Sequence, residues 1–101
     1  MPVDIMSTYG MLHVMTGAEA EALSEVRALA SAWRIRYGAH ALERMDERGA
    51  SRRDVQAALV SADCCRAQPG RRWKVTGVDR DGDDLTVVVV IEGAVVVVTV
   101  F

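Results

Sequence analysis

One histidine and two arginines follow each other at four-residue intervals in the segment 38–51: His40, Arg44 and Arg48. Residues four apart lie on one face of a helix, so a helical segment would present an imidazole and two guanidinium groups as one stripe. An imidazole titrates near neutral pH and can act as a general acid or base, and arginine binds phosphate through paired hydrogen bonds. The spacing therefore predicts a candidate catalytic stripe for chemistry at a phosphate.

The same spacing is also typical of an ordinary solvent-facing helix. His40 would then form local hydrogen bonds near the start of the helix. Glu47 lies three residues after Arg44, a spacing at which an intrahelical ion pair forms. We expect such pairing for at least one of the two arginines, so the stripe alone does not establish catalysis.

A second set of candidate residues lies in the C-terminal third. Strand alternation would place Arg72, Lys74 and Thr76 on one side of a strand, where they could form an anion site or protect a sheet edge. Thr99 could place a hydroxyl beside a substrate, although a structural pair with Thr86 across two strands is the favoured interpretation. We take Arg72, Lys74, Thr76 and Thr99 as the candidate substrate-binding residues.

The sequence predicts neither a metal site nor a cofactor. His13, His40, Cys64 and Cys65 lack the spacing of two to four residues that is typical of zinc ligands. No glycine-rich phosphate loop, nucleophile elbow or paired-carboxylate motif is present. Adjacent cysteines rarely meet disulfide geometry, so both are expected to be reduced thiols.

Length and composition predict one globular domain without a membrane span. The 101 residues suffice for a single core, and half of them are hydrophobic. The net charge of −2 argues against general polyanion binding, but the segment 34–74 holds ten cations and only five carboxylates. No apolar run is long enough to cross a bilayer, and the N-terminus lacks a secretory pattern, so we expect a cytoplasmic location.

Local sequence signals predict where the folded domain begins. Residues 1–16 show no periodicity and are expected to form a loosely docked N-terminal extension, with residues 17–101 as a single domain. Thr16 and Glu19 have the spacing of a capping box at the start of a first helix, expected over residues 18–33.

Two further helices are expected before the predicted strands begin. The segment 38–51 forms the second one, and Gly49 stands where a left-handed residue ends a helix. Ser51 and Asp54 can cap a third helix, which should end near Ala62.

The remaining chain alternates like an antiparallel sheet. Asp81-Gly82 and Glu92-Gly93 are hairpin signals. They separate strands expected over residues 73–79, 85–91 and 94–101, with residues 64–68 as a candidate fourth. The order of elements predicts an α+β fold, with two or three N-terminal helices packed on one face of a three- to four-stranded antiparallel β-meander.

Both faces of the last hairpin are apolar if Glu92-Gly93 forms a tight turn. Val90 would then lie opposite Val95, Val88 opposite Val97 and Thr86 opposite Thr99. An antiparallel sheet with one face in water normally alternates apolar and polar residues. The second face should therefore be covered by a second copy, as in a homodimer, by a partner protein or by the N-terminal extension.

The segment from His40 to Ser51, followed by Asp54-Val55, resembles a known motif. It is similar to the His-Ala, Arg-Met, Glu-Arg-Gly pattern of the small bacterial domains grouped as domain-of-unknown-function family 4258. The segments 73–77 and 98–101 are similar to strands of that family. The resemblance covers about residues 37–101 and leaves the N-terminal third uncovered.

That family looks like a relative of RelE- and BrnT-type toxins, whose helices precede an antiparallel sheet and which cut RNA without a metal. The resemblance implies His40 as acid or base, Arg44 with Arg48 or Lys74 as phosphate clamps, and a minor contribution from Thr76 or Thr99. It also implies attack of a ribose 2′-hydroxyl on the adjacent phosphate. This chain departs from the toxins in its low net charge and its valine-rich sheet, which weakens the expectation of RNA binding.

Two hypotheses of different classes follow. The first is a toxin-like, metal-independent endoribonuclease domain of a toxin-antitoxin type system, with RNA as candidate substrate and an antitoxin-like protein as partner. The second is a non-catalytic interaction domain of the same fold, which self-associates or binds a partner through its apolar sheet face. The lack of an evident base-stacking platform among the few aromatic residues favours the second.

Overall fold

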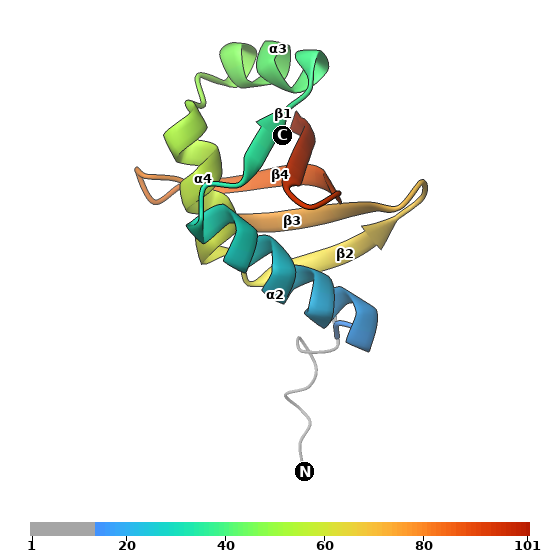
Figure 1. Cartoon of the computed structure of the whole chain (residues 1–101). Coiled ribbons are helices and arrows are strands. Elements are labelled where there is room, and N and C mark those ends of the chain that lie inside the picture. The colour runs from blue at the N-terminus through green and yellow to red at the C-terminus, as the bar shows by residue number, and fades with distance from the viewer. Residues whose placement is uncertain (1–13) are drawn as a thin grey trace.

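The computed structural model describes residues 14–101 as three helices that surround one side of a five-stranded sheet (Figure 1). The predicted extension, residues 1–16, lies mostly outside the described residues, although Met15 packs against the core. In chain order the elements are α2 (Gly17–Ser31), β1 (Ile35–Tyr37), α3 (Ala39–Arg48), α4 (Arg52–Ser61), β2 (Cys64–Gln68), β3 (Arg72–Val78), β4 (Asp84–Ile91) and β5 (Val95–Val100).

The helix boundaries follow the predicted caps. The Thr16 hydroxyl accepts the Glu19 backbone N–H while the Glu19 carboxylate accepts that of Thr16, and Ser51 and Asp54 repeat this arrangement at the start of α4. Gly49 ends α3 with a φ of 70°, in the left-handed region where glycine carries no steric penalty. The three predicted helices are therefore confirmed, with ends that differ by one or two residues.

The sheet is mixed, and this corrects the predicted three- to four-stranded antiparallel meander. Its strand order is β1-β5-β4-β3-β2, and β1 pairs with β5 in parallel. The candidate fourth strand, β2, is confirmed, but β1 was not expected. With three residues it is too short to show an alternation, and its partner lies about sixty positions further along the chain.

The pairing of β4 with β5 differs from the predicted register. Val90 lies opposite Val96 and Val89 opposite Val97, while Val88 lies opposite Thr99. One extra residue, Val98, is therefore inserted on β5, as in a β-bulge. Because of this bulge, Thr99 and Val100 lie on the faces opposite to those that simple alternation along β5 would assign.

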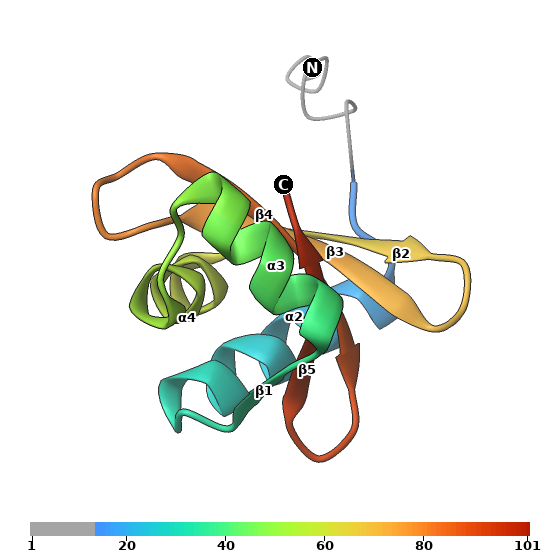
Figure 2. The ribbon, with the colours of Figure 1, turned by 90° about the horizontal axis from the view of Figure 1, so that it is seen from above.

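One face of the sheet carries the helices (Figure 2). α2 contacts β2, β3 and β5, α4 contacts β3 and β4, and α3 packs on β5. Side chains from all three helices join the strand valines in one buried cluster, to which α3 contributes Ala41 and Met45. The helix-covered face of the sheet therefore forms the core.

Helix α4 crosses β3 at Gly77 with no room for a side chain. A Cβ built on Gly77 would lie 1.9 Å from the carbonyl oxygen of Ala58. At the same crossing, the Ser61 hydroxyl accepts the backbone N–H of Val78 at 3.0 Å. The glycine thus allows the helix backbone to lie directly on the strand.

Candidate functional site

Most of the candidate substrate-binding residues lie together on the sheet face opposite the helices, called here the open face. Its cross-strand rows follow from the strand registers. One row holds Cys64, Thr76 and Thr86; the next holds Arg66, Lys74, Val88 and Thr99; the third holds Gln68, Arg72, Val90, Val96 and Arg36.

The charge on these rows is all of one sign. Arg66 and Lys74 lie opposite each other on β2 and β3, with Arg72 one row away and Arg36 at the β1 edge. All four are exposed, and none of the three rows contains a carboxylate. Carboxylates adjoin this area at its margin, where Glu92 forms a 3.7 Å ion pair with Arg36. The middle of the open face is therefore a cationic surface with partly exposed valines between the charges.

Arg66 and Arg36 belong to this surface but were not among the predicted site residues. Alternation within residues 64–68 would have placed Arg66 on the side opposite the buried Cys65, so that signal was present. Arg36 could not be found in this way, because its strand was not expected.

The threonine hydroxyl groups of the open face form a different cross-strand pair from the predicted one. The Thr76 hydroxyl lies 3.1 Å from that of Thr86, so the cross-strand threonine pair is Thr76–Thr86. The predicted pair of Thr99 with Thr86 is wrong, because the bulge places Thr99 opposite Val88. Within residues 14–101, no protein group hydrogen-bonds the Thr99 hydroxyl. Thr99 is therefore the threonine more available to a ligand.

Lys74 has an aromatic neighbour at the end of β5. Its Nζ lies 5.5 Å from the centre of the Phe101 ring, a distance typical of a cation–π contact. The Phe101 backbone N–H donates to the carbonyl of Thr86, which continues the β5 ladder and holds this residue on the open face. The ring is 46 % exposed. An aromatic surface thus lies beside a cation, where the sequence had indicated no stacking platform.

The predicted stripe lies on α3, in the order expected from helix periodicity. His40 is in the first turn and Arg48 is the last helical residue, and both are exposed. His40 and Arg44 each precede a buried position by one, since Ala41 and Met45 face the core. α3 packs on β5, and the C-terminal end of β5 lies beside it in both views (Figures 1 and 2).

Arg44 pairs within its own helix, as expected for at least one arginine of the stripe. Its Nη1 lies 2.9 Å from the Glu47 carboxylate. The Glu47 side chain is 63 % exposed, and an ion pair in such a setting contributes roughly 0.5 kcal/mol, so a phosphate could replace the carboxylate. In the described part of the chain, no hydrogen bond or ion pair joins His40, Arg44 or Arg48 to a side chain of the open face.

The two cysteines lie on opposite faces of β2. Cys64 is partly exposed on the open face, and Cys65 is buried in the core. Burial, together with the nearby Glu19 carboxylate and Cys64, raises the pKa of the Cys65 thiol to about 11. Among residues 14–101, no three His, Cys, Asp or Glu side chains are grouped closely enough to bind a metal ion. His13 lies outside the described residues.

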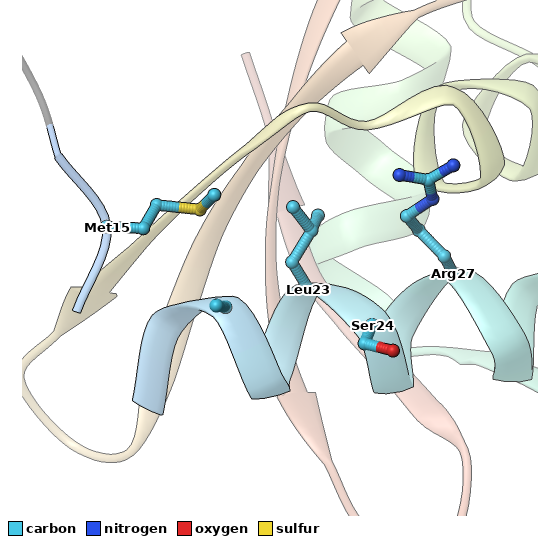
Figure 3. A pocket seen from close by; sticks show the side chains of 5 residues that line it. Met15, Leu23, Ser24 and Arg27 are labelled. Atoms are coloured by element: carbon cyan, nitrogen blue, oxygen red, sulfur yellow. The ribbon is translucent and has the colours of Figure 1, made fainter. Parts of the chain in front are cut away.

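Two surface hollows lie away from the open face, both against α2. The first, of about 230 Å³, is shown in Figure 3, where Met15 and Leu23 line an apolar wall with Arg27 at one end. The second, of about 350 Å³, lies between α2 and the β4–β5 turn. Neither contains a residue of the predicted stripe or of the predicted substrate-binding set.

The fold and the site together define a small α+β domain with a five-stranded mixed sheet, a cationic open face, and a His–Arg stripe on α3, which packs on the helix-covered face. The chain belongs to the family described as Domain of unknown function (DUF4258), which matches residues 37–101. The match begins at the end of β1 and includes both groups of candidate residues, whereas α2 precedes it.

Comparisons with curated proteins and with solved structures gave no match. No helix among residues 14–101 is long and apolar enough to cross a membrane.

Proposed function

We propose that this chain is a toxin-like, metal-independent endoribonuclease domain of a toxin-antitoxin type system. The observation that carries the proposal is the open face, where Arg66, Arg72 and Lys74 gather without a carboxylate in the same rows. Such a surface attracts a polyanion through its phosphates although the net charge of the chain is −2. The exposed Phe101 ring adds a surface on which a base can stack.

The proposed reaction needs a base, an acid and neutralisation of phosphate charge. A ribose 2′-hydroxyl attacks the adjacent phosphorus, its proton passes to a base, and the 5′-oxygen of the next nucleotide leaves with a proton from an acid. His40 serves as the acid or base, and Arg44 with Arg48, on the same helix, stabilises the charge that develops on the phosphate. Lys74, on the open face, binds a phosphate further along the RNA. Thr99 contributes a hydroxyl, and Thr76 is held in the pair with Thr86.

The arrangement of elements also supports a relation to RelE- and BrnT-type toxins. In this chain, as in those proteins, helices precede an antiparallel sheet, here β2 to β5. The parallel strand β1 is added at one edge. A fold alone does not fix an activity, so the proposal depends on the residues of the open face and of α3.

Replacing Lys74 with alanine tests the binding half of the proposal. We expect the variant to bind a single-stranded RNA oligonucleotide more weakly and to reduce the slope of log K against log salt by about 0.7, the value for one phosphate contact on a single strand. Fluorescence anisotropy across a salt series measures both quantities. Arg27→Ala is the matched control, because it removes an exposed cation from α2, on the other face of the sheet. Equal losses in the two variants would contradict a specific role for the open face.

A second candidate function is a non-catalytic interaction domain. It is favoured by two valines of the open face: Val90 and Val96 are only partly buried although they lie in the middle of the sheet. Apolar surface in this position is typical of an interface.

This second function predicts self-association through the valines. Sedimentation velocity over a concentration series should then show a dimer that Val96→Lys disrupts, and RNA should remain uncut. A monomer at all concentrations together with RNA cleavage would favour the ribonuclease.

A further inference from the structure

The second hollow against α2 combines features that suit a cationic side chain. It lies between α2 and the end of the β4–β5 hairpin, with a volume of about 350 Å³, at the low end of the range for binding sites. Glu21 and Glu25, both exposed, form one side, and Trp73 and Ile91, both partly buried, form an apolar wall. The remaining lining residues are Ala18, Ala22 and Gly93.

The carboxylates and the apolar wall of the hollow suit the same kind of ligand. Glu21 and Glu25 are four residues apart on α2, so their carboxylates lie on one face, about 6 Å apart along the helix. In the described part of the chain, neither of them forms an ion pair. An arginine or lysine side chain can pair its charge with a carboxylate while its stem lies on an aromatic or aliphatic surface.

We propose that this hollow binds a basic, extended segment of a separate protein, with arginine side chains at alternate positions. Alternate residues of an extended chain are about 6.6 Å apart, which matches the two carboxylates on α2. The Glu21–Glu25 side is repulsive to RNA, so this surface is distinct from the open face. The inference holds whether or not the domain cleaves RNA.

Two other occupants fit less well. Residues 1–13 contain no lysine or arginine, so they offer no long basic side chain whose stem could lie on the apolar wall. A second copy could supply one from its open face, but that contact would bury the cationic surface to which the proposed function assigns RNA. A separate partner with a basic segment supplies the charges and leaves the open face accessible.

The test uses two capped pentapeptides and the whole chain labelled with ¹⁵N. The peptides are Leu-Arg-Gly-Arg-Leu and its charge-reversed counterpart Leu-Glu-Gly-Glu-Leu. We expect the basic peptide to shift the amide resonances of Ala18, Ala22 and Gly93, and the acidic peptide to leave them unchanged. The double variant Glu21→Gln, Glu25→Gln should weaken binding about tenfold, as the loss of two surface ion pairs implies.

A matched pair of substitutions separates specific binding from general charge. Glu43→Gln with Asp46→Asn removes two exposed carboxylates from α3 and should leave the affinity for the basic peptide unchanged. The proposal fails if the double variant on α2 binds as tightly as the wild-type chain, or if both double variants lose the same affinity. It also fails if the same amides shift on dilution without any peptide, because a second copy would then occupy the hollow.

Discussion

Replacement of His40 by alanine is expected to lower the rate of RNA cleavage by about 10²- to 10⁴-fold, the usual contribution of one general acid or base. His40 is exposed in the first turn of α3, so its removal should not change the folding of the chain. The loss should appear in the maximal rate, because a proton-transfer group acts on the chemical step and not on the binding of the RNA backbone. Cleavage of a fluorophore-quencher RNA by purified protein, at saturating and at limiting enzyme, measures the maximal rate and the binding of the RNA separately.

The controls for His40 use the same helix. Asp46→Ala removes a charged, exposed side chain from a different side of α3 and should retain full activity. His40→Gln keeps a polar side chain without an imidazole, and it should behave like the alanine variant. If His40→Ala cleaves RNA as fast as the wild-type protein, His40 is not the acid or base. If the wild-type protein cuts no RNA, the interaction function takes precedence.

Replacement of Gly77 by alanine is expected to destabilise the fold by about 3 kcal/mol, the upper part of the range for an overpacked site. The new Cβ would lie 1.9 Å from the carbonyl oxygen and 2.8 Å from the carbonyl carbon of Ala58, both backbone atoms of α4. A flexible side chain could move aside at little cost, but here the helix would have to rise from the sheet. Urea unfolding followed by circular dichroism measures the change in the free energy of unfolding. A variant that no longer folds would also show that the substitution destabilises the fold.

The control for Gly77 is another glycine of the same chain. Gly17 is the first residue of α2, and a Cβ built there meets nothing within 4 Å. Gly17→Ala should be neutral or slightly stabilising, because alanine favours the helix and restricts the unfolded chain. A loss at Gly77 no greater than that at Gly17 would contradict the close crossing of α4 over β3.

The structure also shows why the open face needs the whole sheet. Arg66, Lys74 and Thr99 come from three strands, and they share a row only because β3 pairs with both β2 and β4, and β4 with β5. A variant that disturbs one strand pairing would therefore disperse the cations. For this reason the substitutions proposed for the open face exchange exposed side chains and leave the backbone ladder unchanged.

The sequence by itself determined the local elements of this protein. The Thr16–Glu19 and Ser51–Asp54 capping boxes and the left-handed Gly49 act within a single turn, so they mark the helix ends without reference to the rest of the chain. The alternation of Arg72, Lys74 and Thr76 likewise placed them on one face of β3. The pairing of Arg44 with Glu47 was also expected from spacing alone.

Only the tertiary structure decided how distant segments combine. The strand β1 exists because β5 offers it a parallel edge, which no pattern within three residues can show. Two changes moved Thr99 away from Thr86. The connection between the paired residues Ile91 and Val95 has one residue more than the predicted tight turn, and Val98 is an extra residue on β5, where a bulge depends on the packing of the whole hairpin. The His40 stripe was visible as a spacing, but its position beside the end of β5 depends on α3 packing against that strand. Contacts between residues far apart in sequence are selected by the burial of a shared core, and local spacing carries no record of them.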